Sequence, residues 1–243
     1  SHLRFSPHPI QSTYLIEEPT FLACHQFGML GRIPLLEKTV PGSTFLLNSP
    51  YPADEVWAHL PPDVQRTIVE RKLDFWVLDA LRVSTEAGLG NRINTSLQAC
   101  FFKLSELLPI DEAVAAMKEE ITRTYGKRGE AVVRRNHAVI DDALASLTRV
   151  EVPAEVPIVE TPRTALLDAP EFVQRVTSRV MAGEGDLLPV SAMPVDGTFP
   201  TGTARYEKRS LANEMPIWDP EICIDCGRCA LVCPHAAIRL KAY

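Results

Sequence analysis

The sequence predicts an α/β fold: a parallel β-sheet covered by helices on both faces, then an extended linker and a short cysteine-rich segment. Three observations lead to this prediction. Short apolar runs alternate with helical segments in residues 1–150, proline and β-branched residues concentrate after residue 150, and four of the six cysteines lie between residues 223 and 233. Apolar runs separated by helical crossovers are typical of parallel sheets, whose strands are buried on both faces.

Composition narrows the class of protein. The chain has 243 residues, 46% hydrophobic and 23% charged, which is enough for one α/β domain and a smaller appendage. A net charge of −6 argues against a nucleic-acid surface. The sequence has no apolar run long enough to predict a membrane helix. Its first residues also lack the apolar stretch that is typical of a signal peptide. Cys24 and Cys100 are isolated in apolar settings, so we expect a reducing, cytoplasmic location rather than a disulfide framework, with no nucleic-acid or membrane partner.

The expected strands are three short apolar runs, each ended by polar or proline-containing sequence. They cover residues 21–25, 44–48 and 75–78. The helices expected between them are 30–39, stopped by Pro41 and Gly42, then 54–60 and 61–72.

A helical block follows the third strand. Apolar residues recur at helical spacing, which predicts helices over 91–108, 111–125 and 130–150. The proline-rich stretch 151–162 predicts an extended linker. Beyond it we expect one more helix over 170–181 and a non-periodic stretch, 183–216, that wraps over a partner surface.

The four clustered cysteines have the spacing Cys223-x2-Cys226-x2-Cys229-x3-Cys233, followed by proline. Bacterial ferredoxins bind [4Fe–4S] clusters with this spacing: the first three thiolates hold one cluster, and the fourth ligates the other cluster in two-cluster ferredoxins. A zinc site or inert thiols are the alternatives, and the spacing favours iron–sulfur. His235 is expected at the surface rather than as a ligand. Only one such cysteine run is present, so we expect half of a two-cluster segment.

A glycine-containing loop, Gly88-Leu89-Gly90-Asn91-Arg92, precedes a predicted helix. It is interpreted either as a phosphate- or partner-binding loop in which Arg92 supplies charge, or as a turn with an Asn cap. A lone Gly-x-Gly is a weak signal, so the residues alone favour the turn.

The ends of the first two predicted strands also carry candidate side chains. Cys24 and His25 end one strand, and Asn48 and Ser49 end the next. Ligands of open α/β sheets often lie at the carboxyl ends of strands. The simpler interpretation, a buried thiol and hydrogen-bonded polar groups, is favoured here. Cys100 lies on an apolar helix face and is expected in the core.

Several collinear stretches resemble the pyruvate:ferredoxin (flavodoxin) oxidoreductases. The resemblance runs from the first residues through the cysteine segment. It is carried by SHLRF at 1–5, ACHQ at 23–26, GSTFLLNSP at 42–50, GLGNRINT at 88–95, LPVS at 188–191, DGTFPTGT at 196–203, YEKR at 206–209 and the cysteine run with PHAAIR at 234–239.

The resemblance implies a domain organisation. Residues 1–150 would form the family's Rossmann-like third domain, 151–215 a linker and wrapping segment, and 216–243 a partial ferredoxin-like domain that holds a [4Fe–4S] cluster. Such enzymes decarboxylate pyruvate on thiamine pyrophosphate with magnesium, transfer the acetyl group to coenzyme A, and pass electrons to ferredoxin or flavodoxin. The family implies a coenzyme A contact at the residues Gly88, Gly90, Asn91, Arg92 and Asn94.

The thiamine pyrophosphate site is not expected in this chain. The family's Gly-Asp-Gly…Asn signature is absent from the sequence, because Asp196-Gly197 is preceded by Val195 rather than glycine. We therefore expect a piece of the oxidoreductase whose remaining domains are its partners. The alternatives are a stand-alone iron–sulfur subunit completed by a partner, and a truncated product without activity.

Overall fold

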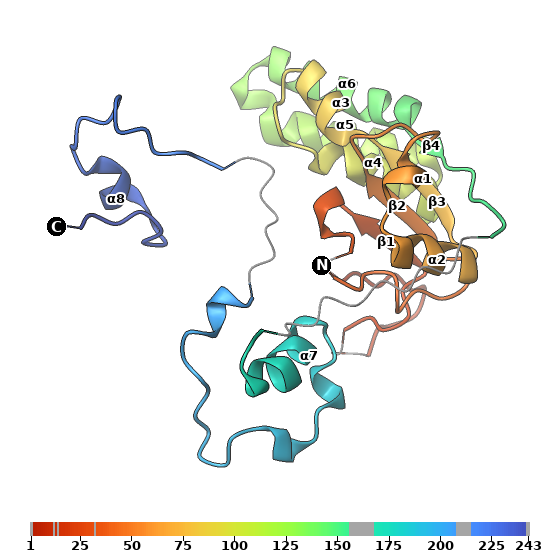
Figure 1. Ribbon diagram of the computed structural model, residues 1–243. Helices are drawn as coiled ribbons and strands as arrows, with labels where there is room; N and C mark the ends of the chain where they lie inside the picture. The colour runs from red at the N-terminus through yellow and green to blue at the C-terminus, as the bar shows by residue number, and fades with distance from the viewer. Residues whose placement is uncertain are drawn as a thin grey trace. The chain divides into compact units, whose positions relative to one another are not determined.

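The computed structural model describes residues 2–11, 13, 15–31, 33–155, 168–207 and 215–241 (Figure 1). The chain divides into two compact units, Ser1–Arg209 and Ser210–Tyr243. The first unit contains the α/β layers and the second contains the cysteine segment.

The α/β layers are built on a four-stranded sheet. Its strands are β1 (Phe21–Cys24), β2 (Thr44–Asn48), β3 (Asp74–Leu78) and β4 (Thr148–Arg149), in the order β1-β2-β3-β4. The first three strands are parallel, and β4 runs antiparallel to β3. The three predicted strands are confirmed. The short β4 was not predicted, because two residues are too few to leave a periodic pattern.

Six α-helices connect and follow these strands in the α/β layers. They are α1 (Val56–His59), α2 (Pro62–Glu70), α3 (Ala80–Glu86), α4 (Asn94–Ser105), α5 (Ile110–Tyr125) and α6 (Glu130–Ser146). Figure 1 shows α3 to α6 gathered on one side of the sheet, while α1 and α2 lie on the other. The predicted Rossmann-like arrangement, with helices on both faces of a mostly parallel sheet, is therefore present.

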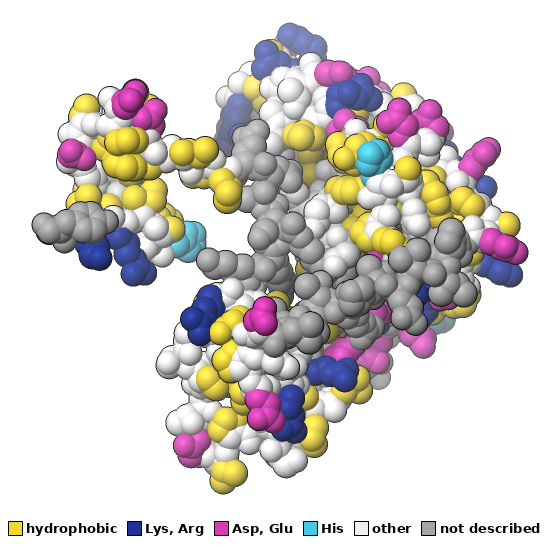
Figure 2. Space-filling view, in the orientation of Figure 1, with side chains coloured by type: hydrophobic (Ala, Val, Ile, Leu, Met, Phe, Trp, Pro, Cys, Tyr) yellow, Lys and Arg dark blue, Asp and Glu magenta, His cyan; other side chains and the backbone are white. Residues whose placement is uncertain are grey.

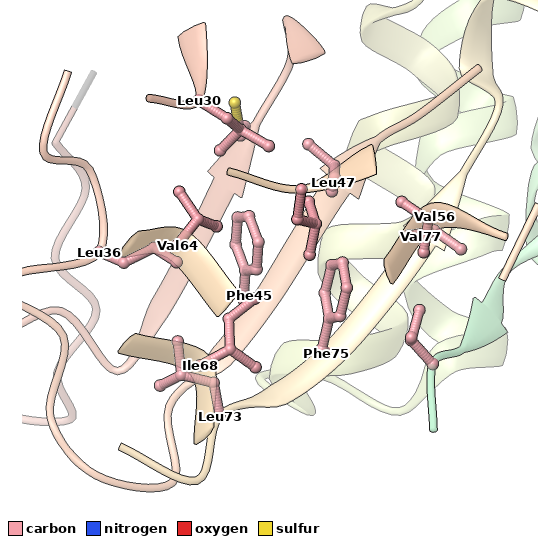
Figure 3. Close-up of a cluster of buried hydrophobic side chains, with 13 residues drawn as sticks. Leu30, Leu36, Phe45, Leu47, Val56, Val64, Ile68, Leu73, Phe75 and Val77 are labelled. Carbon is pink, nitrogen blue, oxygen red and sulfur yellow. The ribbon is translucent and has the colours of Figure 1, made fainter. Parts of the chain in front are cut away.

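The two-residue period of the strands separates two cores. Phe45 and Phe75 point toward α1 and α2, where their rings stack with centroids 5.1 Å apart (Figure 3). Leu46 and Leu78 point to the opposite face and pack among α3, α4 and α6. Helix α5 forms an outer layer, with Met117 and other buried residues against α4 and α6.

The predicted helix over 30–39 is wrong. The described residues of this stretch form turns, and Gly31 has a φ of +75° that does not continue a right-handed helix. Pro34 also lacks the N–H that a helix interior requires. Leu30 and Leu36 are buried in the core beside α2, so their apolar spacing reflects an anchored loop rather than a helix face.

Helix α3 was not predicted, although its start is well defined. The Asp79 side chain accepts a hydrogen bond from the Arg82 backbone N–H at 2.9 Å, which caps the helix. The next predicted helix, 91–108, begins later, at Asn94, and ends at Ser105, where Glu106 adopts a left-handed φ of 51°. The helix predicted over 130–150 ends at Ser146, because the chain continues into β4.

Strand β4 is held to β3 by side chains as well as by its backbone. The Asp74 carboxylate accepts hydrogen bonds from Trp76 Nε1–H at 2.7 Å and from Arg149 Nε–H at 2.6 Å. The Val150 N–H donates to the Phe75 carbonyl at 2.8 Å. These contacts close the sheet on its short antiparallel edge.

The segment 168–207 contains the predicted helix 170–181 in altered form. A stretch of π-helix, Val173–Thr177, leads directly into α7 (Ser178–Met181). Between residues 183 and 207 the described structure holds only short 3₁₀ turns. Residues 156–162 of the predicted linker lie outside the described residues, and the proposed wrapping over a partner surface stays a prediction.

In the described part of the chain, no helix combines the length and apolarity needed to cross a membrane.

Candidate coenzyme-binding loop and iron–sulfur segment

The loop between α3 and α4 takes its shape from two glycines. Gly88 and Gly90 have φ values of +74° and +64°, a region that residues with a Cβ rarely adopt. The Gly88 N–H donates to the Thr85 carbonyl at 2.9 Å, and the Leu89 N–H to the Ser84 carbonyl at 2.8 Å. The turn interpretation of these residues is therefore correct as far as the backbone goes.

Hydroxyl groups of α3 fix the rest of the loop. Ser84 Oγ–H donates to the Arg92 carbonyl at 3.1 Å, and Thr85 Oγ1–H donates to the Gly90 carbonyl at 3.4 Å. The predicted Asn cap is not formed, because α4 begins after Ile93 and no side-chain hydrogen bond caps it. The Asn91 side chain is thus exposed at the loop instead of being used by the helix.

This loop borders an open hollow of about 500 Å³. The predicted residues Gly88, Gly90, Asn91 and Arg92 all line it, whereas Asn94 does not. The structure adds Val132 and Arg135 of α6 to the lining. Sequence reasoning missed Arg135, because it lies in a different helix and carries no local motif. Only the packing of α6 against α3 and α4 brings it to the loop.

The candidate residues at the strand ends have structural roles. Asn48 donates from Nδ2 to the His25 carbonyl at 3.0 Å and accepts at Oδ1 from the Ala80 N–H at 2.9 Å. Ser49 Oγ bonds the backbone of Tyr51 in both directions. The Cys24 thiol donates to the Gln26 carbonyl, and burial raises the pKa of this thiol. The simpler interpretation of these residues is confirmed for Cys24, Asn48 and Ser49.

A second hollow, of about 610 Å³, lies at the carboxyl ends of β2 and β3. Two of its three charged lining residues are already engaged: Asp79 caps α3, and Arg82 forms an ion pair with Glu86 at 3.0 Å. The third, Asp54, is a carboxylate, so the lining of this hollow offers an anionic ligand less than the arginine-bearing hollow at Gly88–Arg92 does.

The cysteine segment is a small unit with a single described helix, α8 (Arg228–Val232). Its four cysteines are free thiols, with Cys226 and Cys229 exposed and Cys223 and Cys233 partly exposed. Apolar side chains also face solvent here, as the yellow surface of this segment shows in Figure 2, and Trp218 is 69% exposed. The segment has too little buried apolar surface to hold its fold by packing alone.

The environment of Cys233 differs from that of the other three thiols. Its Sγ accepts a hydrogen bond from the Ala237 N–H at 3.3 Å. Backbone N–H groups of Ile238, His235 and Ala237 lower the pKa of Cys233 by stabilising its thiolate. Among the described residues, no three Cys, His, Asp or Glu side chains are grouped closely enough to hold a metal ion. The four thiols therefore have the donor chemistry that an iron–sulfur cluster requires without being assembled around one centre.

The remaining cysteine, Cys100, lies fully buried between α4 and α6. Its thiol faces the Ala143 carbonyl at 3.8 Å, and burial raises the pKa of Cys100 to about 12. Its predicted place in the core is confirmed.

Comparison with known families decides the relationship. Residues 1–146 match the family described as pyruvate ferredoxin/flavodoxin oxidoreductase, and residues 216–239 match the 4Fe-4S binding domain. The chain belongs to the pyruvate ferredoxin/flavodoxin oxidoreductase family. Residues 159–212 match a third family, EKR, described as a domain of unknown function. The resemblance inferred from the sequence is thereby confirmed, and all four clustered cysteines fall within the 4Fe-4S match.

Individual relatives agree with this assignment. The chain is 48% identical to the pyruvate-flavodoxin oxidoreductase of Rhodospirillum rubrum, with 100% of the chain and 20% of that protein aligned. It is 46% identical to the pyruvate:ferredoxin oxidoreductase of Moorella thermoacetica, over 98% of the chain and 20% of that protein. The chain thus spans about one fifth of the length of these curated relatives.

A solved structure of the pyruvate oxidoreductase subunit PORC from Thermotoga maritima covers 56% of this chain and 67% of that one. The TM-score is 0.43 and the sequence identity 14%.

Proposed function

We propose that this chain is part of an oxidoreductase that converts pyruvate and coenzyme A to acetyl-coenzyme A and passes the electrons through [4Fe–4S] clusters to ferredoxin or flavodoxin. The observation that carries this proposal is the combination of an oxidoreductase-family α/β unit with a 4Fe-4S segment in one chain. Residues 1–150 form the α/β domain, 151–215 the connecting segment and 216–243 part of the iron–sulfur domain. The cytoplasm is the location that suits its free cysteines.

In the iron–sulfur segment, Cys223, Cys226 and Cys229 would hold one cluster, and Cys233 would serve a second. Their free thiols and at least partial exposure support this assignment. A bound cluster would supply one-electron transfer. The chain's own contribution is to place thiolates and backbone N–H groups around it, which sets its potential.

In the α/β unit, Gly88, Gly90, Asn91 and Arg92 would receive polar groups of coenzyme A, with Asn94 near the start of α4. The support is geometric: four of these five residues line one open hollow, and Arg92 is exposed there. Thiamine pyrophosphate and magnesium would belong to parts of the enzyme that carry the thiamine signature, which this sequence lacks. Those parts would be the partners of the α/β unit.

The loop is tested by calorimetric titration of coenzyme A into the wild-type chain and Arg92→Ala at two salt concentrations. A charge-assisted contact contributes about 1.5–3 kcal/mol, so we expect binding to weaken by roughly tenfold or more. The difference between the two proteins should shrink as salt increases, because exposed charges are screened. Equal affinities in both proteins would assign Arg92 a structural role only.

A further inference from the structure

The hollow beside the Gly88–Arg92 loop has a second wall formed by α6. Arg135 lies against the loop at Gly88: a Cβ placed on that glycine would sit 3.7 Å from Cδ, Nε and Cζ of Arg135. The Arg135 side chain therefore lies within contact range of the loop, and it lines the same hollow as Arg92.

The lining of the hollow is unbalanced in charge. It holds Arg92 and Arg135 but no carboxylate. Within the described residues, neither arginine takes part in a salt bridge, whereas nearby Arg134 pairs with Glu130 at 3.2 Å. Both arginines are exposed, and an anion held between their guanidinium groups would relieve the repulsion between them. The hollow therefore presents positive charge to a ligand.

We propose that Arg92 and Arg135 bind the same phosphate group, the monoester phosphate on the ribose of coenzyme A. This inference rests on the proposed coenzyme A function of the loop. A phosphate monoester carries a charge of about −1.5 to −2 at pH 7, whereas each phosphate of the coenzyme's pyrophosphate carries about −1. A guanidinium fork matches phosphate oxygens in bidentate fashion, and two forks match a dianion.

The test compares coenzyme A with dephospho-coenzyme A, which lacks only this monoester phosphate. Both are titrated calorimetrically into the wild type, Arg135→Ala, Arg135→Lys and Arg134→Ala. Arg134→Ala is the matched control, because Arg134 is the adjacent exposed arginine of α6 and does not line the hollow. Far-ultraviolet circular dichroism verifies that each variant is folded.

We expect Arg135→Ala to bind coenzyme A about tenfold more weakly than wild type and to lose most of the preference for coenzyme A over dephospho-coenzyme A. Arg135→Lys should recover part of the affinity, because it restores the charge without the fork. Arg134→Ala should bind as wild type does.

Other outcomes separate this inference from the proposal on which it rests. If Arg135→Ala binds coenzyme A like wild type while Arg92→Ala is weakened, Arg135 has no part in a site that still binds the coenzyme. If Arg135→Ala weakens both compounds equally, the monoester assignment is wrong. Adenosine 3′,5′-bisphosphate, titrated as a third compound into the wild type and Arg135→Ala, carries the same monoester phosphate. If it binds through Arg135 while coenzyme A does not bind, the arginine pair stands and the coenzyme A function falls. If none of the three compounds binds to the wild type, both proposals are overturned.

Discussion

The cysteines of this chain show how strongly the surroundings of a side chain change its chemistry. Cys100 has apolar neighbours from α4 and α6, and burial holds its thiol in the neutral form. Cys226 and Cys229 are exposed in a segment with little core of its own. These differences give predictions for single residues.

Burial of Cys100 predicts a loss of stability at alkaline pH. Its folded-state pKa of about 12 lies above the ordinary value of 9.0, so the unfolded chain releases this proton first as the pH rises. The contribution is complete below pH 9 and is lost between pH 9 and 12. At pH 10, the free energy of unfolding should have fallen by about 1.4 kcal/mol from this group alone.

Urea unfolding at pH 7.5 and pH 10, under reducing conditions, measures this loss in the wild type and in Cys100→Ala. The variant lacks the titrating thiol, so its free energy of unfolding should fall by about 1.4 kcal/mol less between the two pH values. Identical pH dependence in the two proteins would show that the Cys100 thiol is not protected from ionisation.

A cluster ligand should be required for iron binding. We expect anaerobic reconstitution of the wild-type chain to yield bound iron and sulfide, and Cys226→Ser to lose most of it, because a hydroxyl replaces one of three thiolates around the same cluster. Three protein thiolates leave one iron without a protein ligand, so the wild-type cluster should also be labile. Cys100→Ala is the control, since Cys100 is buried far from solvent. Unchanged iron content in Cys226→Ser would refute the assignment.

At this scale the sequence is informative about chemistry that lies in a local spacing, and less so about chemistry assembled by the fold. The cysteine motif and the two glycines of the Gly88–Arg92 loop can be found by reading along the chain. Arg135 cannot, because its relation to the loop exists only after α6 has packed beside α3. The predicted helix cap at Asn91 is wrong for a related reason. The position of Asn91 before a helix predicts a cap, but α4 starts after Ile93.

Among the elements, the central strands β2 and β3 place large buried side chains in the core. Phe45 of β2 is fully buried, stacks on Phe75 and faces α2 across the first core (Figure 3). Phe45→Ala should lower the free energy of unfolding by about 3–5 kcal/mol, because it removes buried apolar surface and leaves a cavity.

Urea unfolding at pH 7.5 measures this effect, with Leu81→Ala as the control. Leu81 lies on α3 and is 46% exposed, so its truncation should change the free energy of unfolding by no more than about 0.5 kcal/mol. Similar losses in both variants would contradict the position of Phe45 at the centre of the core.

The elements that sequence reasoning found are those whose periodicity is long or whose burial is complete. The central strands β2 and β3 and the long helices α5 and α6 meet this condition. The stretch 30–39 has apolar residues at helical spacing, but Gly31 and Pro34 break the backbone, and long-range burial of Leu30 and Leu36 explains the same spacing. Helix α3 was not predicted because its seven residues follow closely on β3. So short a helix next to a strand hides the change from a period of two residues to one of about 3.6 residues.

At the scale of the whole molecule, the question is whether this chain has activity without the further domains that its longer relatives contain. We expect the purified chain to show no pyruvate-dependent reduction of a viologen, even with coenzyme A, thiamine pyrophosphate and magnesium present. The reason is that it has no thiamine signature and spans about one fifth of its relatives. A full-length relative assayed in parallel is the positive control. Viologen reduction by the chain alone would show that it holds its own thiamine site.

The adjoining coding sequence distinguishes a piece of a large enzyme from a stand-alone electron-transfer subunit. A second Cys-x2-Cys-x2-Cys run followed by a thiamine motif is expected there if the chain is part of the oxidoreductase. The family was predictable from the sequence because its short stretches are collinear along the chain. The proposed coenzyme contact was less predictable, because a hollow between the Gly88–Arg92 loop and α6 has no linear signature.

The Asp74–Trp76–Arg149 contact lets tryptophan fluorescence report on the attachment of β4 to β3. Trp76 is half-buried, and its indole N–H is held by the carboxylate that also binds β4. Trp57 packs on the opposite face of the sheet, and Trp218 lies exposed close to the cysteine run. With Trp57 and Trp218 replaced by Phe, Trp76 is the remaining tryptophan, and its emission maximum becomes an intrinsic optical signal for the detachment of β4.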